Sequence, residues 1–285
     1  MIVVYGALAL GLTGLFFGIL LALASKLFAV KTDPRIDAVR EALPGANCGA
    51  CGYASCVSFA EAVVHEEAPT NGCVPGQEET ARAVADILKR DYIAVKPLVA
   101  TVFCAGDKEK TTDLYVYDGV EDCSVVLHYH NGLKGCSYGC LGLGSCVDAC
   151  PFGVITMGEH GLPVVDADAC TGCGLCVKAC PRDLIKILPQ SDLGHLVLCS
   201  SHDRGKQVSA VCSIGCIACK ACIKACPRDA IEMEEYLAVI DLEKCDDCGK
   251  CVEACRPGTI FQRTTIPDGG KKAKSVKQAA SSGND

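Results

Sequence analysis

Several residue types and motifs are scarce or missing in this chain of 285 residues. It contains no tryptophan and only three methionines, so large apolar side chains contribute little to any core. No G-x-G-x-x-G motif follows an expected strand, and no P-loop G-K-[ST] is present, which argues against a dinucleotide or nucleotide site. No nucleophile is paired with a general base. We therefore expect no catalytic residues and no bond-making active site on this chain.

Basic patches are also missing. The net charge is −7, and residues 1–40 and 267–285 each carry +2, which leaves −11 on residues 41–266. An acidic body without basic residues interleaved with aromatic ones argues against a nucleic-acid partner.

Cysteine, in contrast, is abundant, with 24 residues. In a small secreted protein this fraction would indicate a disulfide scaffold, but this chain is long and its cysteines fall in C-x2-C-x2-C runs. Cysteines that close together favour metal ligation, and they favour a reducing compartment.

Residues 1–30 are predicted to form a transmembrane anchor. No charged side chain occurs from Ile2 to Ser25, and a helix of that length spans about 36 Å, against about 30 Å for a hydrocarbon core. A cleaved signal peptide is the other interpretation, but the basic n-region is missing. Positive charges follow the span, which predicts a single-pass protein of the cell membrane with its cluster-bearing domains in the cytoplasm.

An internal repeat organises the rest of the chain. Residues 150–181 align with 226–256, and each copy has Cys-Pro, two short strands and a new cysteine run. This is the layout of a bacterial two-cluster ferredoxin, present twice. We therefore predict an α+β protein with these parts: anchor 1–30; four-cysteine [4Fe–4S] domain with a connector helix 31–97; strand-rich linker 98–134; ferredoxin-like module 135–190; inter-module segment 191–214; second module 215–265; disordered polar tail 266–285.

Three of the four runs in this repeat have the regular C-x2-C-x2-C-x3-C spacing. The other, "GCSYGCLGLGSCVDACPF" (135–152), has gaps of three, five and three residues, and we call it the irregular run. In two-cluster ferredoxins the first three cysteines of a run hold one [4Fe–4S] cluster and the fourth holds the other. Tetrahedral zinc is the competing interpretation, but it has no use for a third evenly spaced cysteine.

This crossing rule predicts four ligand sets: Cys136, Cys140, Cys146 and Cys180; Cys170, Cys173, Cys176 and Cys150; Cys216, Cys219, Cys222 and Cys255; Cys245, Cys248, Cys251 and Cys226.

An earlier cysteine group has the different spacing C-x2-C-x4-C-x16-C, and comprises Cys48, Cys51, Cys56 and Cys73. It resembles a four-cysteine module of anaerobic electron-transfer proteins in which all four ligands serve one [4Fe–4S] cluster. Zinc is again the competing occupant.

Four cysteines then remain, and either they are buried thiols or they form a sixth cluster site: Cys104, Cys123, Cys199 and Cys212. Whether Cys136 belongs with its run or with these four stays open. We expect at least five [4Fe–4S] clusters, with the sixth undecided.

The apolar N-terminus, the C-x2-C-x4-C-x16-C group and the ferredoxin repeat together resemble the B subunit of the Rnf complex over residues 1–262, in its long form with two ferredoxin modules. The resemblance implies an iron–sulfur electron-transfer subunit of an ion-translocating ferredoxin:NAD+ oxidoreductase, which couples electron flow from reduced ferredoxin toward NAD+ to Na+ or H+ transport. It implies soluble ferredoxin and the membrane and flavin- and NADH-binding subunits as partners.

Because the body is acidic, ferredoxin would need a locally basic docking site, and the basic residues beside clusters are the candidates: Lys178, Arg182, Lys220, Lys224 and Arg228. Two other functions stay open at this stage. One is a polyferredoxin serving another membrane-bound reductase or hydrogenase. The other is an iron–sulfur sensor, although no output domain is visible.

Overall fold

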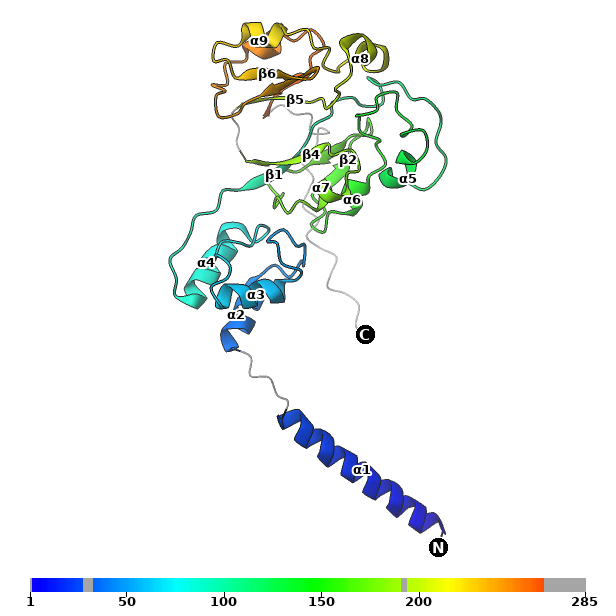
Figure 1. The fold of residues 1–285 in the computed structure, drawn as a ribbon, viewed down its shortest axis with the longest axis vertical. Coiled ribbons are helices and arrows are strands. Elements are labelled where there is room, and N and C mark those ends of the chain that lie inside the picture. The colour runs from blue at the N-terminus through cyan, green and yellow to red at the C-terminus, as the bar shows by residue number, and fades with distance from the viewer. Residues whose placement is uncertain (1, 28–32, 191–193, 264–285) are drawn as a thin grey trace.

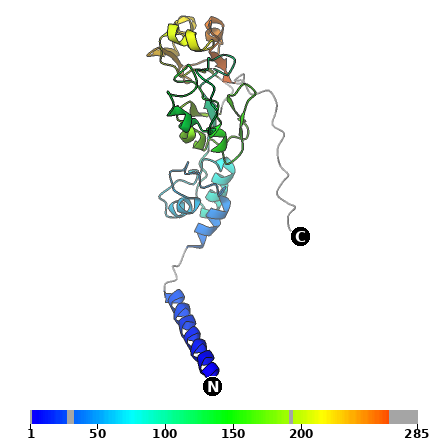
Figure 2. The ribbon, with the colours of Figure 1, turned by 90° about the vertical axis from the view of Figure 1, so that its right-hand side faces the viewer.

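The structure, a computed structural model, describes residues 2–27, 33–190 and 194–263. The described chain forms an N-terminal helix, a small helical domain and two α+β modules, in sequence order (Figure 1). In both Figure 1 and Figure 2 these parts follow one another along the long axis of the molecule. We call the last three the four-cysteine domain, module 1 and module 2. The predicted tail 266–285 lies outside the described residues.

The N-terminal helix is α1 (Ile2–Leu27). Its side chains are described at positions 5–6 and 10–24, and large apolar ones such as Leu15 and Phe16 are exposed. Across the described residues, no helix meets the combined length and apolarity that a membrane crossing requires. The transmembrane anchor therefore stays a prediction.

The four-cysteine domain contains three helices, α2 (Pro34–Ala42), α3 (Cys56–Val64) and α4 (Gln77–Leu88). The first two begin at side-chain caps, because Asp33 accepts a hydrogen bond from the N–H of Arg35 and Ser55 accepts one from the N–H of Ser58. Helix α4 ends at Leu88 and is followed by Lys89, whose backbone is left-handed.

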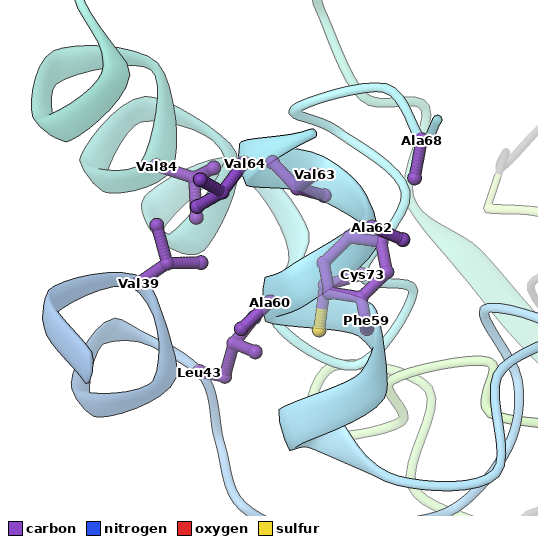
Figure 3. Close-up of a cluster of buried hydrophobic side chains, with 10 residues drawn as sticks. All are labelled: Val39, Leu43, Phe59, Ala60, Ala62, Val63, Val64, Ala68, Cys73 and Val84. Carbon is purple, nitrogen blue, oxygen red and sulfur yellow. The ribbon is translucent and has the colours of Figure 1, made fainter. Parts of the chain in front are cut away.

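The core of this domain is formed where the three helices meet (Figure 3). Figure 3 shows Val39 of α2 and Val84 of α4 facing α3, which contributes Phe59 and Val63. All four side chains are almost fully buried. Cys73 packs on the same cluster, so this core positions the cysteine loop directly.

Module 1 pairs its first strand with its last and holds a hairpin between them. Its elements are β1 (Leu98–Val102), α6 (Ser145–Asp148), β2 (Ile155–Met157), β3 (Pro163–Val165), α7 (Leu175–Ala179) and β4 (Ile185–Pro189). Strands β1 and β4 are antiparallel, with Leu98 opposite Pro189 and Val102 opposite Ile185. Strands β2 and β3 form the hairpin.

Module 2 repeats this plan and has helix α8 between its first strand and its first regular cysteine run. Its elements are β5 (His195–Val197), α8 (Gly205–Val211), α9 (Ala221–Ala225), β6 (Ile231–Glu234), β7 (Leu237–Ile240), α10 (Lys250–Ala254) and β8 (Ile260–Gln262). Strand β5 pairs with β8, and β6 pairs with β7. The two modules match in detail: Phe103 donates to the Leu184 carbonyl at 2.7 Å, and Leu198 donates to the Thr259 carbonyl at 2.9 Å.

The linker 98–134 is less rich in strands than predicted: the apolar and polar residues alternate in "LYVYDGV" (114–120) and "CSVVLHYH" (123–130), which suggests strands, but the structure has none there. In 98–134 the structure has one strand, β1, and it belongs to module 1; likewise β5 joins module 2 and not a separate inter-module segment. Residues Cys123–Leu127 form helix α5, because the Asp122 carboxylate caps it by accepting the N–H groups of Ser124 and Val125.

Candidate metal centres

The four-cysteine domain encloses a cavity of about 330 Å³ whose lining includes all four of its cysteines, Cys48, Cys51, Cys56 and Cys73. A hydrogen bond connects the cysteine loop to the start of α3: the Cys56 N–H donates to Oδ1 of Asn47 at 2.8 Å. Burial, reinforced by the neighbouring thiols, raises the pKa of Cys73 to about 11. The fold thus brings this predicted set around one space.

Module 2 has a cavity of about 340 Å³ lined by a second predicted set, Cys216, Cys219, Cys222 and Cys255. The first three come from one run and the fourth from the next, so the crossing expected from the spacing is reproduced. Burial followed by the charge of neighbouring thiolates raises the pKa of Cys222 to about 11.

The other two regular sets lie in the module cores. Cys170 and Cys176 are buried in the core of module 1, with Cys150 packed against them. Cys251 is buried in the core of module 2 with Cys226 alongside. In both sets burial is the largest cause of a raised pKa, which reaches about 12 for Cys176 and about 11 for Cys251.

The irregular run differs from its prediction at one ligand. A cavity of about 430 Å³ is lined by Cys123, Cys140, Cys146 and Cys180, and Cys136 is not among its lining residues. Cys123 begins α5, and its N–H donates to the Ser145 hydroxyl at 2.8 Å. Helix α5 thus delivers a thiol from outside the run.

Cys136 lines another cavity, of about 350 Å³, together with Cys104, Cys199 and Cys212. Compared with the grouping considered from sequence, Cys136 and Cys123 have exchanged places. Cys104 and Cys136 belong to module 1, and Cys199 and Cys212 belong to the β5–α9 segment of module 2. This cavity therefore lies between the modules. We call it the inter-module cavity.

The short helices explain the exchange. Each of the four begins after a residue with left-handed backbone, which lies two residues before the third cysteine of a run: Gly144, Gly174, Lys220 and Gly249. In the three regular runs the residue just before this position is the middle cysteine. In the irregular run it is Leu143. The irregular run therefore has no cysteine at the position of the middle ligand, and Cys123 lines the cavity instead.

A signal for this arrangement is present in the sequence. "CSYGC" (136–140) matches "CSIGC" (212–216), which makes Cys136 equivalent to Cys212 and Cys140 equivalent to Cys216. Aligning the runs by their Cys-Pro endings alone hides this match. An alignment extended upstream would have separated Cys136 from its run.

Backbone N–H groups point at several of these sulfurs. The fourth cysteine of three runs accepts an N–H from the residue four positions later, at 3.3 to 3.4 Å: Leu184 to Cys180, Ala230 to Cys226 and Thr259 to Cys255. Such donors stabilise negative charge on thiolates and raise the reduction potential of a bound cluster. The three donors occupy equivalent turns after the Cys-Pro ending or its counterpart, so these contacts recur with the sequence repeat.

Arg182 lies between two cysteine cavities, not on the surface available for docking. Its guanidinium donates to the carbonyl of Cys136 at 2.9 Å and to the carbonyls of Gly139 and Asn131. Burial lowers its pKa, and the Cys136 and Cys140 thiolates oppose that shift. The residue places a positive charge beside both groups of sulfurs.

The other four basic candidates differ in how accessible they are to a docking partner. Lys178 is exposed, but its Nζ lies 4.0 Å from the position that a Cβ on Gly49 would take, so it faces the four-cysteine domain. Arg228 pairs with Asp246 at 3.0 Å. Lys220 and Lys224 are exposed beside the module 2 cavity.

Iron–sulfur clusters fit these residues. Each of the four cavities is walled by four thiols, cysteine thiolates are the ligands that such clusters take, and N–H groups are aimed at sulfur. Within the described ranges, no three or more His, Cys, Asp or Glu side chains are grouped as a site for a single metal ion.

Comparisons with known families agree with this chemistry. A putative Fe–S cluster family matches residues 43–75, and 4Fe–4S dicluster domain families match residues 135–184 and 210–256. These three regions are the four-cysteine domain and the two modules, so the chain carries multiple [4Fe–4S] clusters.

Whole-chain relatives extend the comparison. The B subunit of the ion-translocating oxidoreductase complex of Methanosarcina acetivorans is 46% identical over 88% of this chain and 96% of its own length. This chain belongs to the same family, the B subunits of the Rnf complex. The B subunit of the proton-translocating ferredoxin:NAD(+) oxidoreductase complex of Clostridium ljungdahlii is 45% identical over 87% of this chain and 88% of its own.

A third member, the B subunit of the Na(+)-translocating ferredoxin:NAD(+) oxidoreductase complex of Acetobacterium woodii, is 45% identical over 86% of this chain and 74% of its own. As a member of this family, the chain is an iron–sulfur electron-transfer subunit of the Rnf complex, with other subunits of that complex as partners. The resemblance expected from the sequence is confirmed.

Proposed function

We propose that this chain accepts electrons from reduced ferredoxin and passes them, one at a time, toward NAD+ reduction elsewhere in the complex, where electron flow is coupled to Na+ or H+ translocation. The observation that supports this most directly is the series of four-thiol cavities running through the four-cysteine domain, module 1 and module 2. The names of the relatives supply the donor and acceptor.

We assign five clusters to five ligand sets: Cys48, Cys51, Cys56 and Cys73; Cys123, Cys140, Cys146 and Cys180; Cys150, Cys170, Cys173 and Cys176; Cys216, Cys219, Cys222 and Cys255; Cys226, Cys245, Cys248 and Cys251. Four of the sets are those that the spacing predicts. In the second set Cys123 replaces Cys136, because Cys123 lines the cavity and Cys136 does not.

When bound, the clusters supply one-electron redox chemistry. The protein's own residues hold them and tune them. Thiolates supply the bonds to iron, and the turns at Leu184, Ala230 and Thr259 direct N–H groups at ligand sulfurs. The half-buried positive charge of Arg182 favours the more negative, reduced state of a cluster held by the neighbouring sulfurs.

Ferredoxin would dock at the free end of module 2. Lys220 lies next to the exposed Cys219, and Lys224 is exposed one turn further along α9. These two lysines are the least encumbered of the five basic candidates, since Arg182 is engaged with carbonyls and Arg228 with Asp246. Opposite charges steer partners and raise association rates.

Membrane attachment would come from α1, with the cluster-bearing domains on the cytoplasmic side. The support is the uncharged stretch from Ile2 to Ser25 and the exposed apolar side chains of the helix. The basic residues that follow the stretch support the sidedness.

Anaerobic purification of the complex from its native membrane tests this function. We expect reduced ferredoxin to reduce this chain's clusters, seen by EPR, in the wild type and more slowly in a Lys220→Glu, Lys224→Glu variant. A control variant, Lys206→Glu, changes charge on α8 and should leave the rate unchanged. Wild-type clusters that ferredoxin fails to reduce would contradict the proposal.

A further inference from the structure

The inter-module cavity has a symmetry that the sequence repeat explains. Cys104 follows β1 by two residues, and Cys199 follows β5 by two residues. Cys136 and Cys212 each precede the first cluster cysteine of their module by four residues. The four thiols are therefore two equivalent pairs, one from each module. This is the arrangement expected when two copies of one unit build a shared site between them.

Hydrogen bonds at the cavity follow the same symmetry. The Cys140 N–H donates to Sγ of Cys104 at 3.4 Å, and the equivalent Cys216 N–H donates to Sγ of Cys199 at 3.4 Å. Ser201 adds a second donor to Cys199 at 3.5 Å. These contacts match the N–H to sulfur contacts at the ligands assigned above. N–H donors of this kind stabilise the negative charge that a thiolate carries when it is a cluster ligand.

Three glycines keep the inter-module cavity open. A Cβ added to Gly106 would lie 3.2 Å from Sγ of Cys212, and one added to Gly215 would lie 3.5 Å from the same sulfur. A Cβ on Gly139 would lie 3.5 Å from Sγ of Cys136. Side chains at these positions would crowd the cysteines in the cavity wall, and at Gly106 and Gly215 they would also collide with Thr111 and Val208.

The size of the cavity points to the same occupant as its neighbours. It measures about 350 Å³, against about 330 Å³ in the four-cysteine domain and about 340 Å³ in module 2. The inter-module cavity is thus about the same size as two cavities walled by predicted cluster ligands, and it has four thiols in its wall with N–H donors aimed at two of them. These features fit an inorganic cluster.

We propose that Cys104, Cys136, Cys199 and Cys212 hold a sixth [4Fe–4S] cluster, and that this cluster relays single electrons between module 1 and module 2. The relay role rests on the proposed electron-transfer function, whereas the site itself does not. One electron leaves a reduced cluster in one module, which is oxidised, and reduces the inter-module cluster by the same one electron. No bond forms or breaks and no proton moves.

The hydrogen bonds define the route. Cys140 is a ligand of the first cluster of module 1, and its own N–H contacts Cys104 of the inter-module site. Cys216 makes the equivalent link from module 2 to Cys199. Each neighbouring cluster thus reaches the inter-module site through one ligand residue and one hydrogen bond.

The route continues at the other side of module 1. Gln77 of the four-cysteine domain donates to the Cys170 carbonyl at 3.3 Å, and Nζ of Lys178 on α7 lies 4.0 Å from the position that a Cβ on Gly49 would take. The clusters then form one linear series: the second and first clusters of module 2, the inter-module cluster, the first and second clusters of module 1, and the cluster of the four-cysteine domain.

Iron counting on the anaerobically purified full chain tests the site. Six clusters predict about 24 iron atoms and about 24 acid-labile sulfides per chain, and the double variant Cys199→Ala, Cys212→Ala should hold about 20 of each. Ser213→Ala, a substitution at an exposed neighbour of Cys212, is the matched control and should retain the wild-type content. A wild type with about 20 irons, or a double variant with unchanged content, would overturn the site.

A milder variant covers the case in which the double variant fails to fold and loses most of its iron. Cys104→Ser keeps an oxygen ligand, so we expect one cluster to change its EPR signal and midpoint potential while the signals of the other five persist. If no cluster signal changes in Cys104→Ser, Cys104 is not a ligand and the site is overturned.

Freeze-quench EPR of the whole complex tests the relay. With reduced ferredoxin as donor, the wild type should reduce clusters of both modules, whereas the double variant should reduce only those on the donor's side. Equal reduction of both modules in the variant would overturn the relay. Failure of ferredoxin to reduce a wild type that still carries six clusters would contradict only the proposed function.

Discussion

Replacing Cys123 by alanine should damage one cluster in module 1, and this effect distinguishes the two possible ligand sets of the irregular run. Cys123 lines the cavity that also holds Cys140, Cys146 and Cys180, so the substitution leaves three thiols and one open corner. A cluster there would lack one of the four thiolate bonds that hold a [4Fe–4S] cluster, so we expect it to be destabilised. The same change at Cys136 should leave this cluster intact.

A second substitution, Leu143→Cys, should restore the ligand that Cys123→Ala removes. Leu143 occupies the position of the middle cysteine, immediately before the left-handed Gly144 that starts α6. Adding Leu143→Cys to Cys123→Ala recreates the regular C-x2-C-x2-C spacing. The Leu143 side chain is only half-buried, so its loss should cost about 1 to 2 kcal/mol of stability, less than the two to five typical of fully buried leucines.

The assay is iron and sulfide content together with EPR of the dithionite-reduced full chain. We expect the single variant Cys123→Ala to lose one of the wild-type cluster signals and the double variant to regain it. If Cys123→Ala keeps every signal, while Cys136→Ala removes the signal of this module 1 cluster, the assignment from the cavity is refuted. Failure of Leu143→Cys alone to fold would be detected by loss of all module 1 signals.

Three further outcomes are expected. Phe59→Ala removes a side chain that is only 1% exposed, in the core beneath the first cysteine loop. We expect it to lower the unfolding free energy of the four-cysteine domain by about 3 to 5 kcal/mol, measured by thermal unfolding. Val57→Ala, at an exposed site on α3, is the control. Arg182→Gln removes a half-buried charge and should lower the midpoint potential of a neighbouring cluster, by about 60 mV for each ~1.4 kcal/mol of lost interaction. Redox titration measures this potential, and an unchanged value would contradict the electrostatic role. When the chain is expressed without its partner subunits, deleting residues 2–27 should move it from the membrane to the soluble fraction, and persistence in the membrane would contradict an anchor in α1.

The cysteine spacing of the regular runs was enough to predict most of the candidate sites. A C-x2-C-x2-C loop brings three thiols together by local geometry alone, because the ligands are neighbours in the chain and a left-handed residue such as Gly174 or Lys220 turns the backbone around them. The Cys48 to Cys73 set was also predictable from spacing. For these sets the tertiary structure had only to bring in one distant cysteine.

The strand predictions over 98–134 failed for a related reason. Alternation of apolar and polar residues in "CSVVLHYH" suggests a strand, but the Asp122 cap and the packing of Val126 against Leu133 and Leu141 favour a helical turn. Tertiary contacts outweigh such a weak local preference. Helix α5 is important for the candidate site because its first residue, Cys123, lines the module 1 cavity.

What the sequence determined by itself is therefore the family, the cofactor chemistry and the ligands that are close in the chain. Tertiary structure decided the partners of the isolated cysteines. Five cysteines belong to no complete run: Cys104, Cys123, Cys136, Cys199 and Cys212. The strand pairings β1–β4 and β5–β8 place Cys104 and Cys199, α5 places Cys123, and the contact between modules brings Cys136 and Cys212 to the same cavity. Spacing along a chain encodes only local encounters, so a site built from segments far apart in sequence becomes visible only when the modules have folded against each other.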